Sequence, residues 1–160
     1  MNYEISRLNR EGWSKYAYEA WVKGNGTPEQ LAKILMENPW KKLTPFRSYI
    51  ENVQGMRVAN FLGSNGKMAV SMALLGADVT VVDISSENAK YAKELARAAN
   101  VPIEYLVMDV MEFPVEEYSE TFDIVIMELG ILHWIMDLQR FFDMVNQVLK
   151  TGGRVLLRDF

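Results

Sequence analysis

The sequence is poor in the residues that build covalent links and metal sites. Its 160 residues contain no cysteine and one histidine. Disulfides and thiolate metal sites are therefore excluded, and a metal centre built from several histidines is excluded with them. We expect no bound metal.

The sequence also lacks long apolar runs and long runs of basic residues. No run of about 18 apolar residues occurs, so no membrane span is expected. The opening residues, MNYEISRLNREGW, hold no apolar core of signal-peptide length, which favours a cytoplasmic location. No long run of Lys or Arg occurs and the net charge is −4, which argues against a nucleic-acid partner. The length suits one domain with one sizeable core.

Residues 1–56 have helical patterns and no strand pattern. One apolar face with 3- and 4-residue spacing predicts a first helix, and it comprises Trp13, Tyr16, Ala17, Ala20 and Trp21. Thr27, Pro28 and Gln30 form the capping-box start of a second helix over 28–38. A second Thr-Pro pair predicts a further helix over 44–53.

From Arg57 onward, strand-like runs alternate with helix-like runs. Runs that are apolar on both faces and alternate with helices indicate βαβ units and a parallel sheet covered on both sides. The expected strands are 57–61, 78–83, 103–108, 122–128 and 154–159, and the expected helices are 66–75, 86–99 and 137–150. Gly76 and Gly152 stand where glycines end helices, and Ser85 or Ser86 can cap the middle helix.

Unusual residues follow four of these strands. A parallel α/β sheet binds ligands beyond the carboxyl ends of its strands. The turn LGSNGK after the first strand offers two glycines and a helix N-terminus, which suits an anionic group. Asp83 ends the second strand at the spacing of an acid that binds ribose hydroxyls. Asp109 follows the third strand, and the segment MELGILHW follows the fourth.

Each of these signals has a structural explanation when taken alone. The glycines could serve packing, Asp83 could be a helix N-terminal charge, and His133 could pack or cap the next helix. The aromatic residues of the first helix could be plain core. The glycine turn and the acids at the ends of the second, third and fourth strands occur at the same edge of one sheet, and together they favour a nucleotide-like ligand.

The chain resembles the class I S-adenosylmethionine-dependent methyltransferases over residues 57–160. The segments that carry the resemblance are VANFLGSNG, VTVVDIS, VMDVMEFP, FDIVIMELGILHW and LKTGGRVLLRDF. The LGSNG turn and the ELGxLHW segment are similar to one subgroup of that family. The resemblance implies a Rossmann-like sheet with strand order 3-2-1-4-5, residues 1–56 as a helical cap, and S-adenosylmethionine (SAM) as cofactor, with S-adenosylhomocysteine (SAH) as product. The family's last two strands have no counterpart before residue 160, so we expect a C-terminally truncated domain.

The resemblance also implies roles for individual residues. The methionine part of the cofactor would face Asn60, Leu62, Gly63, Ser64, Asn65 and Gly66. Ribose and adenine would contact Asp83, Ile84, Ser85, Asp109 and Val110. The sulfonium end would face Glu128, Leu129 and Gly130. Glu128 and His133 are the candidate bases, and Tyr16, Trp21 and Trp134 would cover the substrate.

Three positions depart from the family pattern. Leu62 and Ser64 replace the first two glycines of the turn, and Asn60 replaces an acid. Asn60 cannot supply a negative charge to the ammonium group of the cofactor. The turn must therefore use backbone carbonyls, the Asn60 oxygen or Glu128.

Two classes of function remain open at this point. The first is a methyltransferase that acts on a small molecule. The second is a non-catalytic cofactor-binding or dimerisation module, and a nicotinamide-dependent oxidoreductase is a weaker third because LGSNGK lacks its glycine spacing. The apolar strand 154–159 would be an unprotected edge, so we expect another strand to cover it, most simply in a homodimer.

Overall fold

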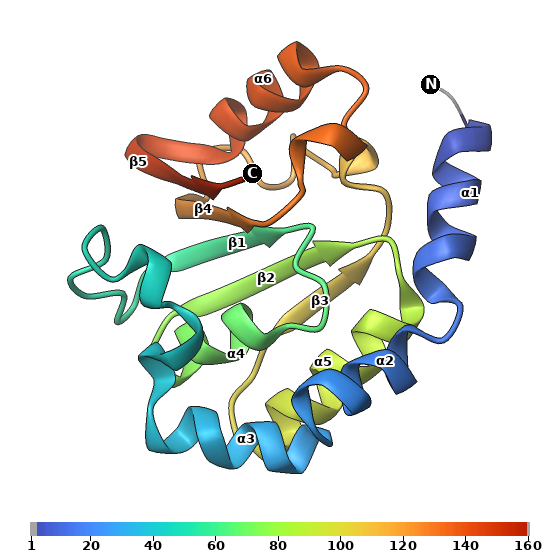
Figure 1. Ribbon diagram of the computed structural model, residues 1–160. Coiled ribbons are helices and arrows are strands. Elements are labelled where there is room, and N and C mark those ends of the chain that lie inside the picture. Colours follow the sequence, from blue (N-terminus) through green and yellow to red (C-terminus); the bar gives the residue numbers. More distant parts are fainter. Residues whose placement is uncertain (1–2, 160) are drawn as a thin grey trace.

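The computed structural model describes residues 3–159. The expected segments 1–56 and 57–160 also include Met1, Asn2 and Phe160, which lie outside the described residues. Five parallel strands form one sheet in the order β3-β2-β1-β4-β5, as expected (Figure 1). The strands are β1 (Arg57–Phe61), β2 (Asp78–Asp83), β3 (Glu104–Val107), β4 (Phe122–Glu128) and β5 (Leu149–Arg158). The parallel Rossmann-like sheet predicted from the sequence is confirmed.

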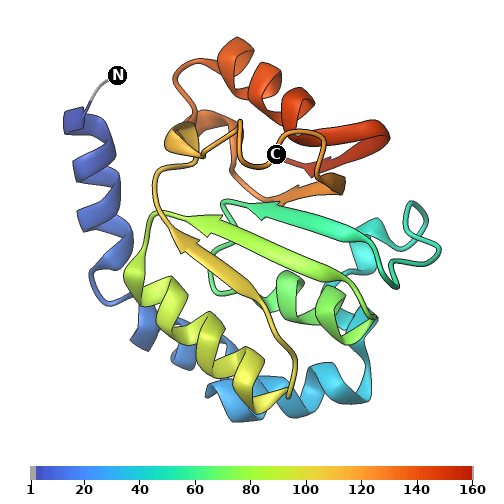
Figure 2. The same ribbon diagram turned by 180° about the vertical axis from the view of Figure 1, so that it is seen from behind.

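Neighbouring residues of a strand point to opposite sides of the sheet, so apolar strands give the sheet two apolar faces. Helices cover both of these faces. The helices are α4 (Lys67–Leu74), α5 (Ser86–Ala98) and α6 (Leu138–Val148). Val58 and Ile124 belong to the apolar core that contains residues of α4 and α5. Their neighbours Ala59 and Val125 belong to a second core with residues of α6. Figures 1 and 2 show α6 and the pair α4 and α5 on opposite sides of the strands.

The N-terminal segment contributes α1 (Tyr3–Ser14), α2 (Ala17–Asn25) and α3 (Pro28–Glu37). The predicted capping box of α3 is present, with Thr27 and Gln30 bonded reciprocally. Leu31 and Leu35 of α3 share a buried cluster with residues of α5. α2 and α3 therefore form an outer layer on the sheet domain, while α1 stands beyond the strand tips (Figure 1).

Two helix predictions in this segment are wrong. The continuous apolar face around Trp13 and Trp21 is split at Tyr16, which has a left-handed φ of 62° and separates α1 from α2. The second Thr-Pro pair starts only a 3₁₀ turn, η2 (Thr44–Phe46), which follows η1 (Pro39–Lys42). The hydroxyl of Thr44 donates back to the carbonyls of residues 40 and 41 instead of capping a following helix.

The boundary between α6 and β5 also differs from the prediction. The helix ends at Val148, and Leu149 is already extended and opposite Phe122. Gly152 has a left-handed φ of 80° but lies in an irregularity of β5 rather than after a helix, so its predicted role is wrong. The matching predictions for Gly76 and for Ser85 as the α5 cap are confirmed.

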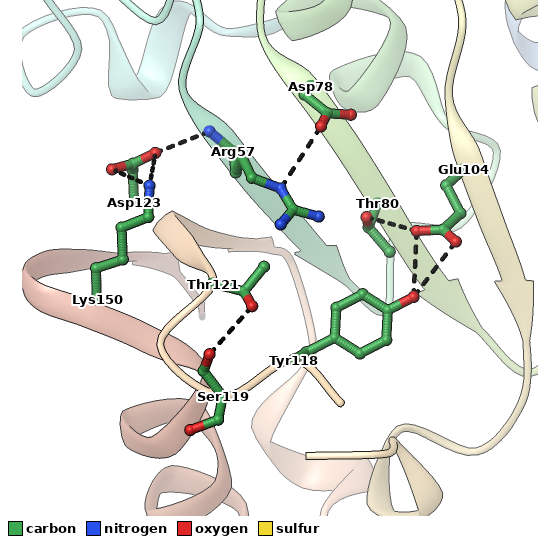
Figure 3. Close-up of polar contacts among 9 residues, drawn as sticks. All are labelled: Arg57, Asp78, Thr80, Glu104, Tyr118, Ser119, Thr121, Asp123 and Lys150. Carbon is green, nitrogen blue, oxygen red and sulfur yellow. Dashed lines mark hydrogen bonds and ion pairs between the residues drawn. The ribbon is translucent and has the colours of Figure 1, made fainter. Parts of the chain in front are cut away.

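Polar contacts tie the amino ends of the strands together (Figure 3). The Arg57 side chain pairs with Asp78 at 3.5 Å, and its backbone N–H donates to Asp123 over 2.8 Å. Tyr118 donates to Glu104 at the β3 edge. These contacts close one end of the sheet and leave the carboxyl ends for the site. No helix within residues 3–159 is long and apolar enough to cross a membrane.

Candidate functional site

A cavity of about 440 Å³ lies at the carboxyl ends of the strands. Its walls come from the segments that follow β1, β2, β3 and β4, together with α1, α2 and the start of α6. In Figures 1 and 2 the arrowheads of β1, β2 and β3 point toward α1. This is the edge at which a parallel α/β sheet binds its ligand.

The loop after β1 has the backbone of a glycine-rich turn although two of its residues are not glycine. Leu62 has a φ of 49° and Ser64 a φ of 53°, both left-handed. A side chain in this region costs about 1–2 kcal/mol. Gly63 between them has no room for a Cβ, which would stand 2.4 Å from Val81 and 2.8 Å from the Asn60 oxygen. The chain therefore has left-handed backbone at the two positions, Leu62 and Ser64, where the family pattern has glycine.

Asp83 holds this loop to the end of β2. Its carboxylate accepts from the backbone N–H of Ser64 over 3.0 Å and from that of Ser85 over 2.9 Å. It also accepts from the Asn88 amide over 3.1 Å. Burial raises the pKa of Asp83 above its ordinary value of 3.8, and these hydrogen bonds partly oppose that rise. Asp83 lines the cavity with an acceptor that is already oriented.

Two buried amide atoms on the cavity wall have no hydrogen-bond partner within residues 3–159. They are Oδ1 of Asn60 and Nδ2 of Asn65. The other end of each amide is occupied: Asn60 donates to the carbonyl of Ile126, and Asn65 accepts from the N–H of Lys67. One free acceptor and one free donor suit a ligand group that carries both kinds of atom.

Two residues support the loop from outside the cavity. The Tyr105 hydroxyl donates to the Ser64 carbonyl over 2.6 Å, and burial raises the pKa of Tyr105 well above its ordinary value. Gly66 does not line the cavity. A Cβ on Gly66 would stand 2.6 Å from Ala92 of α5, so the glycine allows the loop to pack on that helix.

The loop after β3 places Asp109 and Val110 on the cavity wall. Asp109 caps the 3₁₀ turn η3 (Val110–Glu112) by accepting from the N–H of Met111. Its second oxygen accepts from the Ser6 hydroxyl of α1 over 2.7 Å. A ligand donor that used this oxygen would compete with Ser6.

The segment after β4 brings Glu128, Leu129, Gly130 and Trp134 to the cavity. The Glu128 carboxylate is 8% exposed and pairs with Arg158 over 3.0 Å. His133 lies in the turn η4 (Leu132–Trp134), is exposed, and is not part of the cavity wall. Its role as a base stays a prediction.

The N-terminal helices cover one side of the cavity. The Trp13 and Trp134 rings meet edge to face with centroids 5.7 Å apart. The Ser85 hydroxyl donates to the Trp13 carbonyl, and the Trp21 indole donates to Asn88 over 2.7 Å. Trp21 lines the cavity, whereas Ser85 and Tyr16 do not, and Tyr16 is 68% exposed.

Sequence reasoning missed several cavity residues. Lys67, Asn88 and Arg140 come from the first turns of helices, and Ser6 and Asn9 come from α1. The position of Lys67 just after the glycine turn was a usable signal, because helix N-termini face the site. Nothing in the sequence related α1 or Arg140 to this edge of the sheet.

An open parallel sheet with a cavity at the carboxyl ends of its strands defines a Rossmann-like ligand-binding domain. Residues 62–157 match the family model described as a methyltransferase domain. The chain belongs to this family.

Named relatives and solved structures agree with that family. The chain is 30% identical over 122 residues to a ubiquinone biosynthesis O-methyltransferase of Photorhabdus laumondii, covering 73% of this chain and 50% of that protein. It is 28% identical over 105 residues to the protein of the same name from Rhizobium etli, covering 66% and 41%. The chain thus spans about half the length of these relatives, or less.

Solved structures of methyltransferases share the fold. Magnesium protoporphyrin IX methyltransferase from Synechocystis PCC 6803 with bound SAH has a TM-score of 0.66 at 13% identity, covering 91% of this chain and 68% of that one. An S-adenosylmethionine dependent methyltransferase from Mesorhizobium loti has a TM-score of 0.62 at 24% identity, covering 72% and 51%.

Proposed function

We propose that this chain binds S-adenosylmethionine and transfers its methyl group to a small molecule. The observation that carries the proposal is the meeting of three strand-end acids, Asp83, Asp109 and Glu128, on one cavity of a methyltransferase-family chain. The family relatives named O-methyltransferase support the reaction class.

The cavity residues fit the two ends of this cofactor. Asp83 would accept from the ribose hydroxyls, while Ile84, Asp109 and Val110 would contact the adenine. The unpartnered oxygen of Asn60 would accept from the ammonium group of the methionine part.

The carboxylate of the methionine part needs donors, and two are available on the cavity wall. Nδ2 of Asn65 is a buried donor without a partner, and Lys67 is a half-buried cation without an ion pair within residues 3–159. Asn60 and Asn65 thus complement an amino-acid group with one acceptor and one donor. Gly66 and Ser85 would support this binding through packing and capping rather than through contact.

When bound, the cofactor supplies an activated methyl group. What the protein adds is alignment of the acceptor and removal of its proton. Leu129 and Gly130 would line the transfer end, and Glu128 would take the proton because its carboxylate is on the cavity wall. His133, exposed to solvent, is the second candidate base. Trp13, Trp21 and Trp134 would exclude water from one side.

The acceptor is proposed to be a small molecule with an apolar surface. Leu129, Trp134 and Met136 line the cavity and are 43%, 39% and 77% exposed. Exposed apolar groups at a cavity mouth favour a ligand that buries them. We propose a cytoplasmic location, since the function would need no membrane span.

The free edge of β5 is proposed to pair with another strand, most simply that of a second copy. Among the described residues β5 pairs only with β4. Val155 is 38% exposed. The neighbouring Arg154 guanidinium donates a hydrogen bond to the Tyr49 carbonyl over 2.8 Å. An open edge with apolar residues favours strand addition.

Transfer of a labelled methyl group tests the reaction. The chain is incubated with methyl-labelled SAM and metabolite pools, and labelled products are separated. We expect a labelled small molecule with the unaltered chain and much less with Glu128→Gln. Cofactor binding without any labelled product would instead favour the non-catalytic module.

A further inference from the structure

Asp159, which follows β5, binds the loop that leaves β4. Its Oδ1 accepts from the backbone N–H of Gly130 over 2.8 Å, and its Oδ2 accepts from that of Leu132 over 2.9 Å. Hydrogen bonds to an ionised carboxylate are stronger than those between neutral groups. A single side chain therefore fixes the loop at two points.

The loop has a conformation that needs such support. Leu129 has a φ of 62° and Gly130 a φ of 71°, so two successive residues are left-handed. For leucine this costs about 1–2 kcal/mol. Leu129 is 43% exposed, so its side chain is only partly held by packing. The Leu129 N–H donates to the Arg158 carbonyl over 2.8 Å, which makes the end of β5 the support on both sides of the bend.

The same loop forms a wall of the cavity. Leu129, Gly130, Ile131 and Trp134 all line it, and Trp134 also meets Trp13 of the covering helix. Asp159 itself is not on the cavity wall. One route from Asp159 to a bound ligand therefore runs through the position of this loop.

We propose that Asp159 is a positioning residue that fixes the loop 129–134 at the methyl-transfer end of the site. This inference rests on the proposed function for the identity of the ligand. Loss of either hydrogen bond would let Leu129 relax from its left-handed conformation and move the wall away from the transfer end. Binding of the adenosine part, which Asp83 and Asp109 would contact, would change much less.

The test uses Asp159→Asn in the full chain. Asparagine keeps the shape but has one oxygen, so it cannot accept from both N–H groups. Asp123→Asn is the matched control, since Asp123 accepts from the Arg57 N–H and pairs with Lys150 at the other end of the same two strands. Hydrogen exchange of residues 129–134 is measured first. Affinities for SAH and for sinefungin, an analogue with an amine-bearing carbon in place of the sulfonium, are measured by calorimetry.

We expect faster exchange of the loop in Asp159→Asn and unchanged loop exchange in Asp123→Asn. We also expect sinefungin affinity to fall at least about fivefold more than SAH affinity, because only sinefungin has an additional amine-bearing group that packs against the loop at the transfer end. Unchanged loop exchange would overturn the proposal, as would an equal fall for both ligands. If the unaltered chain binds neither ligand, the proposed function fails, and the exchange result alone then decides whether Asp159 holds the loop.

Discussion

The backbone N–H of Ser64 donates to the Asp83 carboxylate over 3.0 Å, which joins the loop after β1 to the end of β2. The contact makes Asp83 both part of the proposed ribose site and an anchor of the neighbouring loop. Its effects on ligand binding and on the fold can be separated by pH.

Acidification should weaken SAH binding through Asp83. Burial raises its folded-state pKa above 3.8, so Asp83 takes up a proton at a higher pH than an ordinary aspartate and would then lose its charge-assisted hydrogen bonds to the ribose hydroxyls. Affinity measured by calorimetry should therefore fall as the pH drops toward that raised pKa. Asp83→Asn should bind roughly tenfold or more weakly at neutral pH, and its affinity should not show this pH dependence.

The stability effect of the same group has the opposite sign. A carboxyl whose pKa is raised by folding favours the folded state below its unfolded pKa, and this contribution is lost as the pH rises through the folded pKa. We therefore expect SAH affinity to fall at a pH where circular dichroism shows that the chain is still folded; a loss of affinity that occurs only together with unfolding would contradict this explanation.

Removing the Tyr105 hydroxyl should loosen the ligand loop. Tyr105→Phe removes the 2.6 Å bond to Ser64 and should lower the free energy of unfolding by about 1 kcal/mol. We also expect a several-fold loss of SAH affinity. Tyr118→Phe is the control, because its hydroxyl bonds to Glu104 at the opposite end of the sheet. Equal loss of SAH affinity in both variants would show that only overall stability matters.

The Asn60 oxygen should recognise the amino-acid part of the cofactor. Asn60→Ala removes a buried acceptor that has no partner within residues 3–159. SAH affinity should fall about tenfold, as expected for a hydrogen bond to a charged group. Affinity for 5′-methylthioadenosine, which lacks the amino-acid part, should change by less than about twofold. A parallel loss for both ligands would mean that the substitution damages the whole cavity.

Gly66 should be essential for packing of the loop on α5. Gly66→Ala combines a left-handed φ of 75° with a Cβ 2.6 Å from that of Ala92. Gly55→Ala has nearly the same φ, 74°, and open space around its Cβ. Denaturant unfolding should show a loss of about 1–2 kcal/mol for Gly55→Ala and about 1–3 kcal/mol more for Gly66→Ala. Similar losses would remove the packing argument.

The strands of the sheet were predictable because short apolar runs between turn residues favour buried strands over other secondary structure. β1, β2 and β4 have the predicted bounds, since their mainly apolar runs are bordered by turn residues or charges. The acids at strand ends were predictable for the same reason, as strand direction fixes which end of each run meets the ligand.

Other features depend on contacts that the sequence pattern does not contain. The apolar spacing around Tyr16 is that of one helix, yet the chain turns there, and Trp13 then reaches Trp134 while Trp21 reaches Asn88. A glycine at position 152, after a helical pattern, is typical of a helix end. The strand nevertheless begins before Gly152, because Leu149 already pairs with Phe122. Asp159 gave no signal at all, because its hydrogen bonds are to a loop almost thirty residues away in the sequence.

Calorimetry with SAH and NAD tests the central claim most directly. We expect that the chain binds SAH, that NAD does not compete, and that Asp83→Ala remains folded while binding SAH roughly tenfold or more weakly. Binding of NAD in preference to SAH, or unchanged SAH affinity in folded Asp83→Ala, would contradict the account.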